Sequence, residues 1–115
     1  MKYAAKLTVP SLTVESAPVS VEIAIPENFL LGYEIFFPPG CAGLCGIRIF
    51  INAIQVAPAR GSADLWFRGE GSITWVGRYR MGGGSPAGAR VVIEGYNDDD
   101  TYPHTPLIRL DGGAE

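Results

Sequence analysis

The chain contains few of the residues that carry out most enzyme chemistry. Its 115 residues include two cysteines, one histidine and only two lysines, Lys2 and Lys6. A nucleophilic hydrolase needs a base beside its nucleophile, so His104 would have to be that base. The sequence holds no Gly-x-Ser-x-Gly segment of the kind that presents a catalytic serine. We therefore expect a protein that is not an enzyme and has no catalytic residues.

Charge and long apolar runs are also scarce. Charged residues make up 18% of the chain, hydrophobic residues 47%, and the net charge is −3. This composition argues against disorder and against the basic surface that grips nucleic acid. No apolar run approaches the roughly 20 residues of a membrane helix, so no membrane partner is expected. The first residues lack the apolar core of a secretory signal, which predicts a protein of the cytoplasm or of a particle assembled there.

Turn-forming residues are abundant, with 15 glycines and 9 prolines. The length fits one domain, residues 1–115, with a core of its own. Hydrophobic residues recur with a period of two, most cleanly where Val19, Val21, Ile23 and Ile25 share one face.

Short alternating segments of this kind, bounded by turn residues, recur along the whole chain. The other segments expected to be strands are residues 3–9, 31–37, 46–51, 54–56, 72–79, 90–96 and 107–110. Asn52-Ala53 is expected to be a two-residue turn, and Ser62 to cap one helical turn over residues 63–65. About eight short strands predict an all-β fold, an antiparallel β-sandwich of the jelly-roll type.

The Gly-rich segment 82–88 fits a dinucleotide-binding fingerprint only formally. That motif joins a strand to a helix, whereas here Pro86 intervenes and residues 90–93 have a strand pattern. We interpret the segment as a surface loop and predict no cofactor.

The two cysteines, Cys41 and Cys45, are too few for a structural zinc site, which needs four ligands. Nothing in the spacing relates them to His104. A disulfide closing so short a ring would add only ~2 kcal/mol. We expect free, buried thiols and no metal site, and we interpret His104 as a turn histidine that hydrogen-bonds its own loop.

The densest charge lies at Asn97-Asp98-Asp99-Asp100-Thr101. Carboxylate oxygens suit Ca²⁺, but the spaced pattern of a calcium loop is absent. A solvated turn capped by Asn and Asp side chains is the preferred interpretation, and cation binding stays open.

Aromatic residues gather in the second half of the chain, where they could stack against sugar rings or pack in the core. They are Trp66, Phe67, Trp75, Tyr79, Tyr96 and Tyr102. A carbohydrate-binding or receptor-binding β-sandwich module is therefore the alternative function.

Several segments carry a family resemblance. They are Phe37-Pro38-Pro39-Gly40-Cys41-Ala42-Gly43-Leu44, Arg48-Ile49-Phe50, Gln55, Pro58, Trp66-Phe67-x-Gly69 and residues 95–105 with Asn-Asp-Asp-Asp-Thr-Tyr-Pro-His-Thr. Across most of residues 1–110 the chain resembles small β-sandwich proteins encoded among the structural genes of tailed phages and prophages. The resemblance implies a virion component and brings no catalytic residues. Cys45 and the length of the 82–88 loop depart from the pattern.

These observations predict a non-enzymatic virion structural protein, a capsid-decorating or tail-surface component that assembles in the host cytoplasm. Its partners would be copies of itself, most simply as a trimer, and the major capsid protein or another virion protein. Pairing of the N-terminal strand with a neighbour's sheet edge is one route to the oligomer. The predicted interaction loops, which could lie at one end or at opposite ends, contain Pro38, Pro39, Gly40, Leu44, Asn97, Asp98, Asp99, Asp100, Tyr102 and His104.

Overall fold

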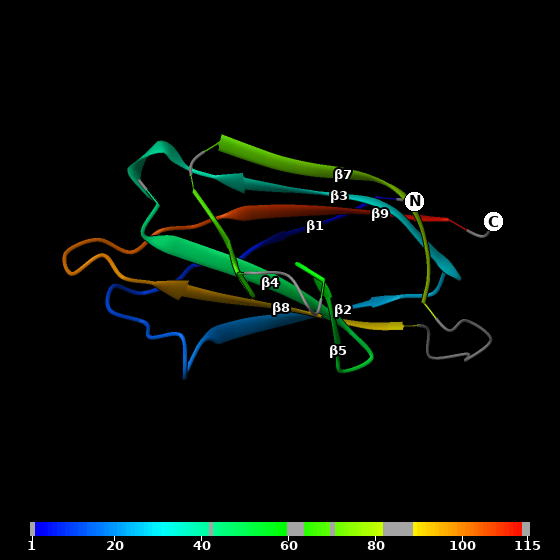
Figure 1. Cartoon of the computed structure of the whole chain (residues 1–115), viewed down its shortest axis with the longest axis horizontal. Helices are drawn as coiled ribbons and strands as arrows, with labels where there is room; N and C mark the ends of the chain where they lie inside the picture. Colours follow the sequence, from blue (N-terminus) through cyan, green and yellow to red (C-terminus); the bar gives the residue numbers. More distant parts are fainter. Residues whose placement is uncertain (1, 42, 60–63, 70, 82–88, 114–115) are drawn as a thin grey trace.

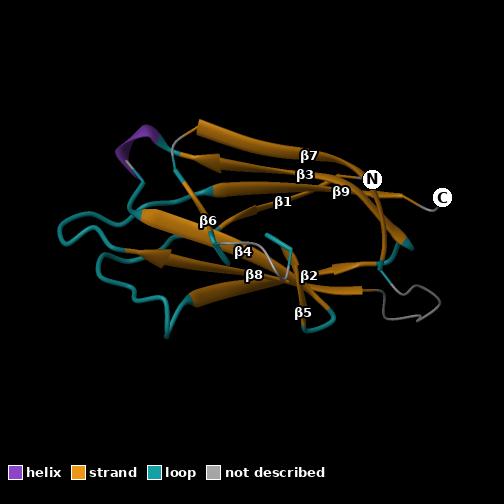
Figure 2. Cartoon of the chain, in the orientation of Figure 1, coloured by secondary structure: helices purple, strands orange, loops and turns teal. Residues whose placement is uncertain are grey.

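Two antiparallel β-sheets pack face to face in the computed structural model (Figure 1), which describes residues 2–41, 43–59, 64–69, 71–81 and 89–113. The predicted all-β sandwich is confirmed. Strands dominate the described residues, and the one helical element among them is a short 3₁₀ turn (Figure 2). Among these residues no helix has the length and apolar character needed to cross a membrane.

Four strands form the first sheet and five the second. The first sheet has the order β1 (Lys2–Lys6), β9 (Leu107–Gly113), β3 (Phe29–Phe37), β7 (Gly71–Arg80). The second has the order β2 (Val19–Ile25), β8 (Ala89–Asn97), β4 (Cys45–Ile51), β5 (Ile54–Ala57), and β6 (Phe67–Arg68) also pairs with β4. The 3₁₀ turn η1 (Pro39–Cys41) links β3 to β4.

All eight segments expected from the alternation contain a strand, with ends that differ by a few residues. The first strand ends at Lys6, earlier than predicted. Asn52 and Ala53 form the expected turn, with φ values of 50° and 69°, the left-handed conformation that such hairpins need. Strand β6 was not predicted, because two residues carry no periodicity.

Two predicted features fall wholly or partly outside the described residues. The Gly-rich loop 82–88 is one, and Ser62 with Ala63, the start of the predicted helical turn, is the other. The described remainder of that turn, Asp64 and Leu65, is not helical, so the predicted turn is wrong there.

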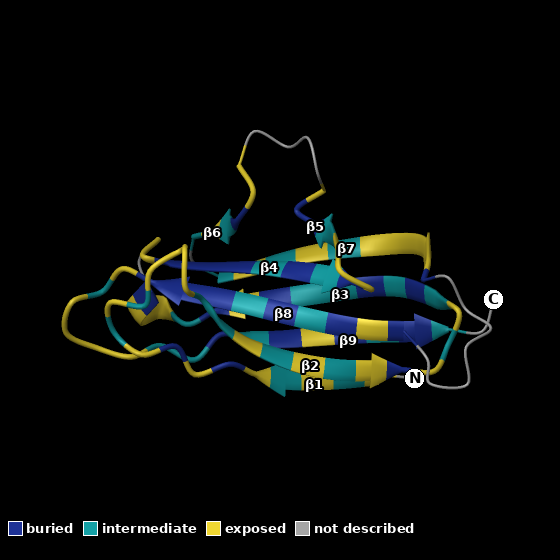
Figure 3. Cartoon of the chain, turned by 90° about the horizontal axis from the view of Figure 1, so that it is seen from below, coloured by how far each residue is buried: buried dark blue, intermediate teal, exposed yellow. Residues whose placement is uncertain are grey.

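The core lies between the sheets and is built by the predicted alternation. Exposed and half-buried residues alternate along β2, as Figure 3 shows. In the centre of the second sheet, Ile47 and Ile49 of β4 and Ile93 of β8 are fully buried against the first sheet. A face-to-face stack of this kind fixes the strand register, because a slip of one residue would turn every apolar side chain outward.

Three chain connections meet at one end of the sandwich, on the left in Figure 1. They are the segments 7–18, 38–44 and 98–106, which follow β1, β3 and β8 respectively. We call these three segments the loop end. The two chain termini lie at the opposite end of the sandwich (Figure 1).

Candidate functional site

Backbone hydrogen bonds join the three segments of the loop end to one another. The amide of Leu12 donates to the carbonyl of Asp99 (3.0 Å), and the amide of Asp98 donates to the carbonyl of Leu44 (2.9 Å). The Asn97 amide donates to the carbonyl of Thr13 (2.9 Å). The predicted interaction loops 38–44 and 97–104 therefore lie at the same end, and a third segment, which the sequence did not indicate, lies beside them.

Asn97 is a buried polar residue whose side chain hydrogen-bonds to two segments of the loop end. Its side-chain amide donates to the carbonyls of Val9 (3.2 Å) and Tyr102 (3.0 Å). Its side-chain oxygen accepts from the Asp99 amide (2.9 Å) and from the Cys45 thiol (3.6 Å). Every polar atom of this side chain thus has a partner, as burial demands.

The acidic run is the turn capped by Asn and Asp side chains that the sequence predicted. Asp99 Oδ1 accepts the backbone amides of Thr101 (2.8 Å) and Tyr102 (3.2 Å), and Oδ2 lies 2.8 Å from His104 Nε2. The bond from the Thr101 amide, followed by that from His104, holds the pKa of Asp99 below its usual range. Asp98 and Asp100 remain exposed.

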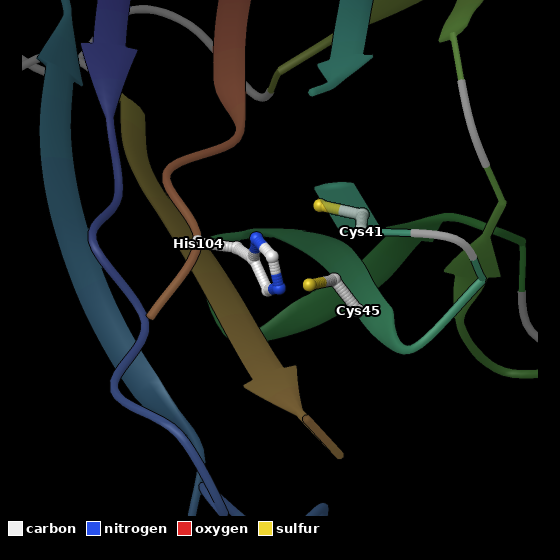
Figure 4. A group of neighbouring side chains, drawn as sticks. All are labelled: Cys41, Cys45 and His104. Carbon is white, nitrogen blue, oxygen red and sulfur yellow. The ribbon is translucent and has the colours of Figure 1, made fainter. Parts of the chain in front are cut away.

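The fold brings Cys41, Cys45 and His104 together, although their spacing gave no reason to expect it. Their ligand-capable atoms all lie within 4.8 Å of one another. In Figure 4 both thiols project toward the imidazole ring, one from η1 and one from the start of β4. Both cysteines are fully buried and neither forms a disulfide bond, as the sequence predicted. Burial, with the neighbouring Cys41 thiol, raises the pKa of Cys45 far above its usual range.

Gly40 lies beside this ring. A Cβ atom there would lie 3.2 Å from His104 Cε1 and 3.5 Å from Nδ1. His104 also hydrogen-bonds through Nε2 to Asp99, as expected of a turn histidine. The imidazole is therefore held by the Asp99 carboxylate, and a side chain at residue 40 would crowd the ring.

Four large apolar side chains are exposed at the loop end. Leu12 (63% exposed) and Tyr102 (65% exposed) project into solvent, together with Val14 and Leu44. Sequence reasoning missed Leu12 and Val14, although Pro10 and Pro18 mark their segment as a loop that could not bury them in a sheet. Of the ten predicted interaction residues, six are exposed, namely Pro39, Gly40, Leu44, Asp98, Asp100 and Tyr102.

Apart from Tyr102, which is exposed at the loop end, the predicted aromatic residues fall into two groups. Trp66 and Tyr96 are buried, with their rings edge to face at 4.8 Å. Trp75, which stacks on Tyr33 at 5.5 Å, and Tyr79 line a cavity of about 310 Å³ beside Phe67. Residues of β3, β5, β6 and β7 line this cavity.

No protein-family model matches the chain, and no curated protein matches it significantly.

Proposed function

We propose that the chain is a non-enzymatic structural protein of a virion, which acts as a homo-oligomer and binds a neighbouring virion protein through its loop end. The observation that carries this proposal is the exposed apolar group of Leu12, Val14, Leu44 and Tyr102 on three hydrogen-bonded segments. Exposed apolar side chains on adjoining segments are typical of protein interaction sites.

The rigidity of the loop end supports this role. Asn97, Asp99 and the inter-segment backbone bonds hold the loops in one arrangement before any partner arrives. A surface that is already ordered loses less conformational entropy on binding, so more of the contact energy appears as affinity. The exposed carboxylates of Asp98 and Asp100 beside the apolar group favour a partner surface with basic residues.

The edge of strand β7 that no described strand pairs with supports the proposal that the chain forms a homo-oligomer. Within the described residues, this ten-residue strand pairs only with β3, and Val76 on it is 84% exposed. A long open strand edge attracts another strand unless it is covered. The N-terminal strand β1 instead pairs with β9 of its own chain. Contacts through β7 would join copies, and several copies on one lattice bind with added avidity.

The thiols and the imidazole favour a structural role over a catalytic one. Both cysteines are fully buried, and the Cys45 thiol donates to Asn97 rather than facing solvent. His104 Nε2 is engaged by Asp99. Nucleophilic catalysis requires a thiolate that a substrate can reach, and these groups are turned inward.

Cosedimentation with virion particles tests the proposal. The particles would be those of a phage or prophage whose genome encodes this chain. The double variant Leu12→Ser, Tyr102→Ala should lose most of its binding, because it removes the two most exposed apolar side chains of the group. Ile54→Ser is the matched control, since Ile54 is an exposed apolar residue in the β4–β5 hairpin. Binding of the double variant equal to that of the control would contradict the proposal.

Carbohydrate binding is the second candidate, favoured by the aromatic lining of the 310 Å³ cavity at Tyr33, Phe67, Trp75 and Tyr79. Aromatic faces stack well on apolar sugar faces. A saturable change in tryptophan fluorescence on adding an oligosaccharide, lost in Tyr79→Ala, would support this function in place of the first.

A further inference from the structure

We infer that Cys41, Cys45 and His104 form a binding site for a thiophilic cation, Zn²⁺ or Cu⁺, which would cross-link two segments of the loop end. The inference is independent of the proposed virion role. It concerns the interior of the loop end, whereas the proposed interaction surface is its exterior.

The distances within the cluster suit a metal ion after a small contraction. Three atoms within 4.8 Å of one another enclose a point about 2.8 Å or less from each, and zinc bonds sulfur at about 2.3 Å and imidazole nitrogen at about 2.0 Å. Each ligand atom would therefore move inward by less than about 1 Å. The two cysteines lie on either side of a short turn closed by the Leu44 amide donating to the Cys41 carbonyl (2.7 Å), which keeps their backbones close.

One nitrogen of the imidazole already has a carboxylate partner of the kind that metal-binding histidines have. When Nε2–H donates to Asp99 Oδ2 (2.8 Å), the lone pair is left on Nδ1. The Nδ1–Cε1 edge of the ring faces Gly40, the residue next to Cys41. Metal-binding histidines characteristically donate their second nitrogen to a carboxylate, which fixes the tautomer and makes the ring a better ligand. Asp99 is the carboxylate that accepts from His104 here, and the backbone amides of Thr101 and Tyr102 in turn donate to Asp99.

The donor set and its burial select the class of cation. Two thiolates and one imidazole favour Zn²⁺ and Cu⁺ over Mg²⁺ and Ca²⁺, which prefer oxygen. Both cysteines are fully buried and the His104 side chain is only 10% exposed. Zinc would use a water molecule as its fourth ligand, while Cu⁺ accepts the three protein ligands alone.

The ligands lie on different elements, so the cation would act as a clamp. Cys41 ends η1, Cys45 begins β4, and His104 lies in the connection from β8 to β9. A ligand that binds only the folded state raises the free energy of unfolding. Binding should also displace the thiol proton that Cys45 now donates to Asn97.

Titration of the reduced, metal-free protein with Co²⁺, a coloured substitute for Zn²⁺, tests the site directly. We expect a thiolate-to-cobalt absorption band that saturates at one Co²⁺ per chain and disappears when Zn²⁺ is added. A parallel arm uses Cu⁺ held by a competing chelator. The cation that binds more tightly, and raises the melting temperature more, is the one the site selects.

The variants Cys41→Ser and His104→Gln should each abolish the cobalt band, while Asp100→Asn, an exposed change in the same loop, should keep it. Because a change in the core can unfold the chain, circular dichroism checks each variant. A second readout uses wild type alone, where Zn²⁺ should slow the reaction of both thiols with a thiol reagent at least tenfold. A titration that gives no thiolate band with Co²⁺, and thiol reactivity that neither Zn²⁺ nor Cu⁺ slows, would overturn the inference. Any cation bound without these effects would then be adventitious surface binding only.

Discussion

At residue 46 the chain has a glycine because the ring of Tyr96 fills the space that a side chain would need. Tyr96 is fully buried on the outer face of the second sheet, beneath Trp66, and its hydroxyl accepts a hydrogen bond from Arg68. Burial raises the pKa of Tyr96 to about 12, although the charge of Arg68 acts in the opposite direction. Arg68 also forms an ion pair with Asp64 (2.7 Å) and so holds β6 and its approach against the sheet.

Gly46→Ala should therefore be strongly destabilising. The new methyl group would overlap the Tyr96 ring, and overpacking of a core typically costs about 1–3 kcal/mol. Urea unfolding measures the loss. Ser20→Ala, at an exposed position in β2, is the control and should change stability by less than about 0.5 kcal/mol. Equal stability of the two variants would show that the ring does not occupy this space.

The hydrogen bond between Tyr3 and Glu27 predicts that the folded protein loses stability at alkaline pH. Its hydroxyl donates to the Glu27 carboxylate (2.5 Å to Oε1), and this bond, with some desolvation, raises the pKa of Tyr3 to about 12. An unfolded tyrosine ionises near pH 10, so between pH ~10 and ~12 the folded state binds more protons. The stability contributed by Tyr3 is complete below that range and is lost as the pH rises through it.

Chemical unfolding at a series of alkaline pH values checks that stability falls, and does not rise, as the pH increases. Wild type should lose stability more steeply than Tyr3→Phe across the range, because phenylalanine has no proton to lose. Some loss should remain in the variant, since the pKa of Tyr96 is also raised. A steeper loss in Tyr3→Phe would contradict the assignment.

At the scale of elements, alternation alone predicted the strands, because a two-layer sheet makes residues of period two face the core. The turn at Asn52-Ala53 was also predictable from local sequence, because asparagine tolerates the positive φ that such turns need. Strand β6 was not, because Phe67 and Arg68 are held in place by pairing with β4 and by the contacts of Arg68.

The candidate site depends on strand order, which no local pattern contains. Strands β4 and β8 are neighbours in the sheet, and their register sets Cys45 opposite Asn97. That pairing brings the connection after β8, with its histidine, beside the start of β4. The thiols and His104 could be named from the sequence as separate residues, but their meeting could not be predicted.

The edge of β7 should carry the contact between copies. Val76→Lys adds a charge to the open edge, a change that discourages strand pairing. We expect it to lower the mean molar mass measured by light scattering toward that of one chain. Ser20→Lys on β2 is the control and should leave the oligomer intact. If the wild-type protein stays monomeric at every concentration tested, the proposed homo-oligomer, including the predicted trimer, is contradicted.

At the scale of the whole molecule, the sandwich is an elongated body of 44 × 26 × 24 Å with two dissimilar ends. One is the loop end, with its exposed apolar group, and the other carries the chain termini (Figure 1). This polarity lets a rigid body present one end to a lattice while β7, along its side, faces a neighbouring copy. The hydrogen bonds of Asn97 and Asp99 hold the loop end in one arrangement, as presentation to a lattice would require.

Oxidative footprinting of the protein, free and bound to virion particles, tests the central claim most directly. Each exposed side chain reports its own accessibility, so the bound surface is identified residue by residue. The account predicts that modification of Leu12 and Tyr102 slows at least severalfold on the particle, while Ile54 in the β4–β5 hairpin reacts as before. Unchanged rates at Leu12 and Tyr102 in a particle-bound sample would contradict it.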